Sequence, residues 1–241
     1  MKLCRMQIVA VCLLFLVVLF IASVPAFGQH GTLGVDFGET SDRFGALPRY
    51  TDPVGDVNGE VILLHGSNPK DNWPNVVAGG ELRFPSDSNH HANEFEIYGG
   101  LRFHATKSLD IGFNAGIRKI DVPPSTVDGQ VFNRFNMELI ETPLVIEYKF
   151  GPEKHFFVRA EGAPEYTPRF RNSSTGLSPL PNPSLDYAYF MRGIVGYNFG
   201  RWYVKGTYQT RYFKFTPTIG NPENLNNWRT DFATAGVGLN F

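Results

Sequence analysis

Eight stretches of the chain alternate between apolar and polar residues with a period of two, the pattern of a β-strand with two unlike faces. These stretches are residues 76–84, 94–105, 109–118, 140–150, 155–169, 186–199, 202–212 and 232–241. In the last of them, Val237 and Leu239 share one face while Gly236 and Gly238 lie on the other. Charged residues are absent from the apolar face of every stretch. The pattern predicts an all-β protein made of long strands.

The connections between these strands indicate which face is inside. Short links fall at 106–108, 151–154 and 200–201, whereas longer links rich in Pro, Asn, Asp and Ser fall at 85–93, 121–134, 171–184 and 216–228. Short turns on one rim and long loops on the other are typical of transmembrane β-barrels, which turn their apolar face to lipid. The strands also exceed the roughly 5–6 residues usual in soluble sheets. A soluble secreted barrel with the opposite orientation remains an alternative.

Two prolines interrupt the predicted strands. Pro143 lies within 140–150 and Pro164 within 155–169. Since proline has no backbone N–H to donate to a ladder, we expect a bulge or another irregularity at each.

The first 28 residues form a separate segment. Lys2 and Arg5 precede a long apolar run that ends in small residues, which predicts a secretory signal peptide over 1–28, cleaved after Ala26 or Gly28. An uncleaved membrane anchor is the alternative. Both cysteines of the chain lie in this segment, so we expect no disulfide or thiolate chemistry in the mature protein.

The chain ends on an alternating apolar pattern, Val237-x-Leu239-x-Phe241. This ending resembles the C-terminal signature of bacterial outer-membrane β-barrels, and the resemblance implies that the barrel assembly machinery recognises Phe241. In size the chain is similar to the small eight-stranded barrels of the OmpA/OmpX type. The expected fold is a transmembrane up-and-down antiparallel β-barrel over residues 75–241. Residues 29–74 are expected to form an N-terminal extension; alternatively they add a hairpin and give ten strands.

The polar faces would then line the lumen. Its predicted charged residues are Glu81, Arg83, Glu94, Glu96, Arg102, Asp110, Arg118, Glu147, Lys149, Arg159, Glu161, Glu165, Arg169, Arg192, Lys205 and Arg211. Asp186 lies on the polar face of the stretch 186–199. An isolated buried charge is costly, so charges in a narrow barrel must pair. We expect an ion-pair network that plugs the lumen, with a narrow ion or proton path as the alternative.

Few residues point to chemistry. The tetrapeptide of residues 65–68, His-Gly-Ser-Asn, resembles the His-x-Ser-Asn motif of outer-membrane lipid A deacylases, but it precedes the eight strands instead of lying late in the barrel. His90 and His91 could bind a metal but lack an evident third ligand. His104 is expected in the lumen as a member of the network. No catalytic, cofactor-binding or metal-binding residue is therefore predicted.

The net charge of −1 gives no electrostatic reason to expect a nucleic-acid partner. The expected function is that of a bacterial outer-membrane barrel with a structural, envelope-integrity or surface-contact role through its long loops. Its expected partners are outer-membrane lipid and lipopolysaccharide, and we expect a monomer without a cofactor. A narrow channel for small or apolar solutes and a lipid-modifying enzyme are the alternatives.

Overall fold

The structure is a computed structural model, and its described parts are nearly all β. The described residues are 30–45, 49–64, 74–86, 92–122, 125–127, 130–132, 134–173, 185–215 and 227–241. Across these ranges, helical geometry is limited to the short 3₁₀ turn η2 (Pro152–Lys154), and no helix could span a membrane. The predicted signal peptide 1–28 and its cleavage site lie outside the described residues.

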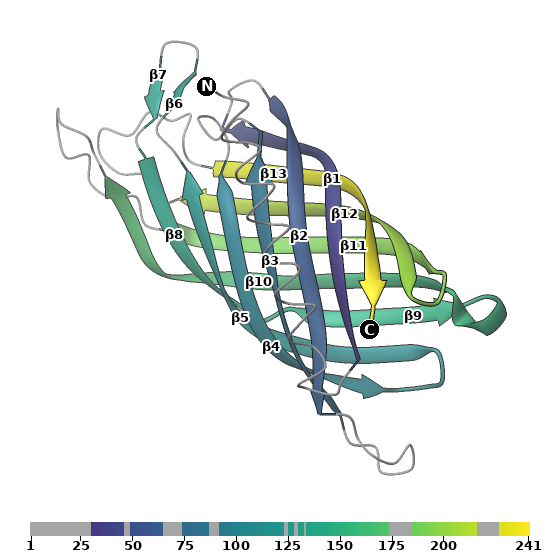
Figure 1. The fold of residues 1–241 in the computed structure, drawn as a ribbon. Coiled ribbons are helices and arrows are strands. Elements are labelled where there is room, and N and C mark those ends of the chain that lie inside the picture. The colour runs from purple at the N-terminus through teal and green to yellow at the C-terminus, as the bar shows by residue number, and fades with distance from the viewer. Residues whose placement is uncertain are drawn as a thin grey trace.

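Long antiparallel strands make up the fold (Figure 1). In chain order they are β1 (Gly31–Phe44), β2 (Tyr50–Leu64), β3 (Asn75–Pro85), β4 (Asn93–His104), β5 (Leu109–Val122), β6 (Ser125–Val127), β7 (Gln130–Phe132), β8 (Arg134–Glu141), β9 (Leu144–Phe150), β10 (Phe156–Ser173), β11 (Leu185–Asn198), β12 (Trp202–Phe215) and β13 (Asn227–Asn240). The two short strands β6 and β7 pair with each other as a separate ribbon.

The remaining strands close into a barrel. Their order is β11-β12-β13-β1-β2-β3-β4-β5, followed by a position that β8 and β9 share, and then β10, which pairs with β11 and completes the ring. Strands β8 and β9 count as one position because both pair with β5 on one side and with β10 on the other. The barrel therefore has ten strand positions, and closure leaves it without a sheet edge.

The all-β up-and-down barrel predicted from the sequence is confirmed, and its strand count is ten, where eight was preferred. The additional pair is the hairpin β1–β2, with β1 between β13 and β2. Gly31 and Phe241 exchange backbone hydrogen bonds of 2.8 and 3.0 Å, which join the two ends of the barrel chain. The hairpin escaped the alternation pattern because charged Glu39 and Arg43 lie on its outer face.

The predicted irregularity at the two prolines is confirmed. Strand β10 leaves β9 after Gly162 and joins β8 at Glu165, so Pro164 lies at the junction between the two partners. Pro143 lies in the gap between β8 and β9. The missing N–H groups of both prolines thus fall at one discontinuity of the barrel wall.

The two rims differ as the sequence predicts, with one exception: the connection between β2 and β3, residues 65–74, belongs to the rim of the short turns. Turns between β4 and β5, β9 and β10, and β11 and β12 are tight; Gly151 and Gly200 adopt positive φ angles of 80° and 82° in the last two, a conformation that glycine adopts without strain. The opposite rim carries the long connections and the β6–β7 ribbon, which projects at the upper left of Figure 1. A fifth connection on that rim, between β1 and β2, is short.

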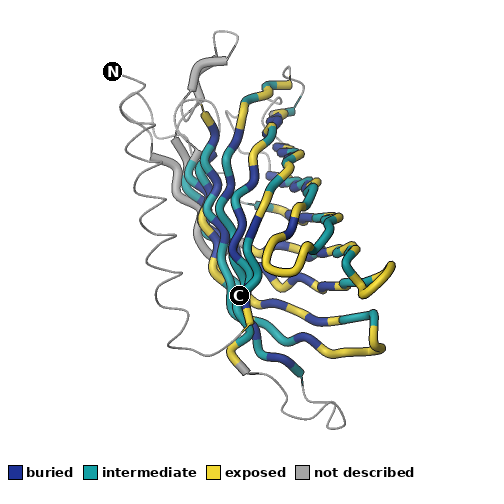
Figure 2. Tube along the Cα trace, turned by 45° about the vertical axis from the view of Figure 1, so that its right-hand side comes forward, coloured by how far each residue is buried: buried dark blue, intermediate teal, exposed yellow. Residues whose placement is uncertain are grey.

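The alternation of the sequence becomes an alternation of exposure along each strand (Figure 2). In β4, for example, Glu94 and Glu96 are buried while Phe95 and Ile97 are exposed. One residue of a predicted polar face departs from this alternation. Asp186 is exposed, at the point where the pairing of β11 with β12 shifts between Leu185 and Tyr187.

Candidate functional site: the charged lumen

The outside of the barrel is a wide apolar surface. Phe37, Met191 and Val195 are each at least 60% exposed, which is unusual for such side chains in water-soluble proteins. Aromatic residues gather at the short-turn rim, among them Tyr148, Phe150, Phe156, Phe199 and Trp202. An apolar band with aromatic residues at its edge is the surface that a bilayer requires of a barrel.

The lumen carries the charges. Every charged lumen residue predicted from the sequence, apart from Arg169, whose side chain is not described, forms at least one ion pair. These pairs join side chains across the lumen as well as neighbours on adjacent strands, because the interior is narrow enough for long side chains to span it. The expected ion-pair network is present in the described residues.

We call the half of the lumen nearer the long loops the loop half. Two arginines form the centre of the network there. Arg118 on β5 contacts Glu94 and Glu141 at 2.8 Å each and also binds Glu96. Arg211 on β12 contacts Glu165 at 2.6 Å, Glu94 at 2.8 Å and Glu141 at 3.0 Å. The side chains of both arginines are 0% exposed. Each guanidinium is thus held by carboxylates from several strands, as burial of a charge demands.

A second group of ion pairs is centred on Arg83 and Arg192. Arg83 binds Glu81 and contacts Asp56 at 3.3 Å and Glu94 at 3.2 Å, which links it to the first group. Arg192 binds Glu81 from the other side of the lumen and donates to Gln209 at 2.8 Å. Together the two groups join strands from all around the barrel into one connected network.

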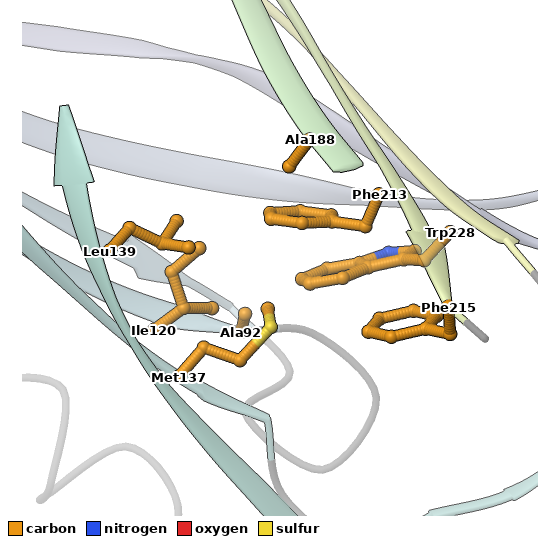
Figure 3. Packing of buried hydrophobic residues seen from close by; sticks show 8 residues of the cluster. All are labelled: Ala92, Ile120, Met137, Leu139, Ala188, Phe213, Phe215 and Trp228. Atoms are coloured by element: carbon orange, nitrogen blue, oxygen red, sulfur yellow. The ribbon is translucent and has the colours of Figure 1, made fainter. Parts of the chain in front are cut away.

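Above the charges, the loop end of the lumen is closed by apolar side chains (Figure 3). The cluster consists of Ala92, Ile120, Met137, Leu139, Ala188, Phe213, Phe215 and Trp228. Phe213 stacks on Trp228 with ring centroids 4.8 Å apart, and the Trp228 Nε1–H donates to Asp42 at 2.9 Å. This cap differs from the expectation drawn from the sequence, because the alternation predicts polar residues along the whole inner face.

The half of the lumen nearer the short turns is more open. Glu60 on β2 accepts hydrogen bonds from Tyr98 at 3.0 Å, Arg102 at 2.9 Å and Arg159 at 3.1 Å. Lys205 contacts Asp36 at 2.9 Å. Between these groups lies a cavity of about 360 Å³, which extends to residues of the short-turn rim such as Phe241. Water can therefore reach charges in this half from one side.

Four carboxylates of the network were missed from the sequence: Asp36, Asp56, Glu60 and Glu141. The first three belong to the β1–β2 hairpin, which was read as an extension. Glu141 has the inward parity of its strand, so its position alone could have identified it.

The histidines contribute little to a reactive site. His104 lies at the short-turn rim with its Nδ1 2.5 Å from Asp110, as a network member, and its side chain is 54% exposed. The tetrapeptide 65–68 and the pair His90 and His91 lie outside the described residues. In the part of the chain that the structure describes, no group of three or more His, Cys, Asp or Glu side chains is arranged to hold a metal ion.

Comparison with known proteins finds solved outer-membrane barrels. Neisserial surface protein A shares 11% identity, with a TM-score of 0.42, over 88% of this chain and 97% of its own. The KdgM porin shares 12% identity, with a TM-score of 0.40, over 88% of this chain and 99% of its own. The outer membrane protease OmpT of Escherichia coli shares 11% identity, with a TM-score of 0.38, over 88% and 97%.

No family model matches the chain, and no curated protein matches it. The assignment of the chain to a membrane therefore depends on the fold and on the surfaces of the barrel. A closed antiparallel ring removes every unpaired strand edge, which lipid requires of a spanning sheet. Three further features are those of a transmembrane barrel. They are the apolar exterior, the charged interior, and the short turns opposite long loops. The chain is a ten-stranded β-barrel of the bacterial outer membrane.

Proposed function

We propose that this barrel is a non-conducting platform of the outer membrane, with a structural or surface-contact role carried by the loops on its long-loop rim. The observation that supports this function is the filling of the loop half of the lumen. There, two fully buried arginines and their carboxylates lie beneath a cap of stacked aromatic rings.

The energetics of the loop half favour a lumen that is blocked by ion pairs over one that conducts ions. An ion that entered this layer would have to displace Arg118 or Arg211 from carboxylates at 2.6–3.0 Å. Separating a buried ion pair leaves unpaired charges in a poorly solvated space, at a cost of several kcal/mol per ion. The same contacts tie opposite walls of the barrel together, which gives the loops a rigid base.

The open half of the lumen supports a second candidate, a narrow path for small solutes. Its cavity of about 360 Å³ would be the entrance on the periplasmic side. This function requires the arginine layer and the aromatic cap to move aside. We propose no enzymatic activity for the lumen and expect the barrel to act as a monomer, assembled through recognition of Phe241.

Conductance in planar bilayers tests the platform against the path. The barrel, extracted from outer membranes and shown to be folded by its heat-modifiable migration on gels, is inserted into a bilayer under an applied voltage. We expect no steady conductance. A steady conductance that changes in the Arg118→Gln variant but not in an Arg201→Gln control, at the exposed short-turn rim, would overturn the platform and establish the path.

A further inference from the structure

A group of basic side chains lies on the outer surface of the barrel, apart from the lumen. We call Arg43 on β1, Arg49 just before β2, and Arg229 on β13 the rim arginines. Arg43 is exposed, and the side chains of Arg49 and Arg229 are 62% and 52% exposed. All three lie close to the rim that carries the long loops, which is the extracellular rim of such barrels.

Two of the rim arginines face each other directly. Arg43 and Arg229 are partners in the register of β1 with β13, which places their β-carbons about 4.5–5.5 Å apart on one face. Like charges in this arrangement destabilise a sheet. The repulsion disappears when an anion lies between the two guanidinium groups, because each can then donate hydrogen bonds to it.

The acids nearby do not balance the rim arginines. Asp231 is 3.0 Å from Arg229 and 3.8 Å from Arg49, and it also accepts a hydrogen bond from Tyr208 at 3.2 Å. Glu39 lies on the same face of β1, two residue rows farther from the loops. Among the described residues of this outer face, the two acids leave the three arginines with a net positive charge. An anionic headgroup that lies between the rim arginines can therefore accept hydrogen bonds from guanidinium groups on more than one strand.

Apart from Asp231 and Glu39, the outer surface below the rim arginines is apolar. On β13 it continues through Ala233, Ala235 and Val237, all exposed, and on β1 it reaches Phe37, which is 68% exposed. The positive charge therefore lies at the upper edge of a surface suited to hydrocarbon chains. A molecule that fits both parts has phosphate groups at one end and several acyl chains at the other.

We propose that the rim arginines bind the phosphate groups of a phosphorylated glycolipid of the outer leaflet, the lipid A part of lipopolysaccharide, whose acyl chains lie along β1 and β13. The guanidinium forks of Arg43, Arg49 and Arg229 supply the paired donors that phosphate oxygens prefer. Tyr208, which is 51% exposed, lies at the boundary between the charged and the apolar parts. The site is independent of the lumen, so it stands whether or not the barrel conducts.

Binding of purified lipid A to the folded barrel in mixed micelles tests this site. The test variant carries Arg43→Gln, Arg49→Gln and Arg229→Gln. A matched control carries Lys107→Gln, Lys154→Gln and Arg201→Gln, which removes the same charge from three exposed positions at the short-turn rim. Heat-modifiable migration confirms that each variant is folded, so a loss of binding is not a loss of structure.

We expect the test variant to bind diphosphoryl lipid A at least about tenfold more weakly than the unaltered barrel, and the control to stay within about twofold. Dephosphorylated lipid A should bind both variants and the unaltered barrel equally weakly. Equal affinity of the test variant and the unaltered barrel for diphosphoryl lipid A would overturn the proposal. So would undiminished binding of dephosphorylated lipid A. Full competition by inorganic phosphate at millimolar concentration would identify a site for free anions and overturn the assignment to lipid.

Discussion

The two halves of the lumen use the same residue types and differ in access to water. In the loop half, Arg118 and Arg211 are fully buried among carboxylates and covered by stacked aromatic rings. In the short-turn half, Arg159 and its partners line a cavity that extends to the rim. An ion pair inside a barrel therefore makes no fixed contribution to stability. Its contribution depends on whether water can replace a lost partner.

Removal of one arginine from each half should give the largest contrast. Arg118→Met removes one positive charge from a fully buried group of carboxylates and takes from Glu96 its arginine, so we expect the free energy of unfolding to fall by about 4 kcal/mol. Arg159→Met removes one partner each from Glu60 and Glu161, which keep Arg102 and Arg192 and lie beside the cavity, where water can solvate them, so we expect a loss of about 1 kcal/mol. Urea unfolding in detergent micelles, followed by the loss of the fast-migrating band, measures both. Equal losses would contradict the distinction between the two halves.

Removal of one indole inside the barrel and one outside should give the next contrast. Trp228 is 1% exposed and stacks on Phe213, so Trp228→Ala creates a cavity and should cost about 3 kcal/mol. Trp202 is 57% exposed on the outer face, and Trp202→Ala should cost less than about 1 kcal/mol in micelles. Equilibrium unfolding monitored by gel migration avoids reliance on the tryptophan signal itself. A small effect at Trp228 would show that the cap is not tightly packed.

The smallest contrast concerns the wall of the short-turn half. A β-carbon at Gly236 would lie 1.8 Å from Asp36 Oδ1 and 2.7 Å from the Val35 carbonyl oxygen, so Gly236→Ala should destabilise by about 2 kcal/mol. At Gly193 nothing lies within 4 Å, and Gly193→Ala should change stability by less than about 0.5 kcal/mol. The same unfolding measurement distinguishes them. Tolerance of Gly236→Ala would mean that the open half is loosely packed as well as hydrated.

Much of the network could be predicted from the sequence, because the side-chain period of a strand is local. Arg118 and Glu161 were assigned to the lumen from parity alone, and both are there. Three of the four carboxylates that escaped prediction lie where the period is disturbed. Arg43 and Glu39 place charge on the outer face of β1, which hid the hairpin and with it Asp36, Asp56 and Glu60.

The two unlike faces, the long strands and most of the short turns and long loops of this protein can be read from its amino-acid sequence. Those properties follow from the pleat of each strand and from turn residues within a few positions. The number of strands, the partners of each arginine, and the division of the lumen into a buried and an open half can be found only in the folded barrel. These depend on how the sheet closes, because the stagger of a closed barrel fixes which residues of distant strands meet across its interior.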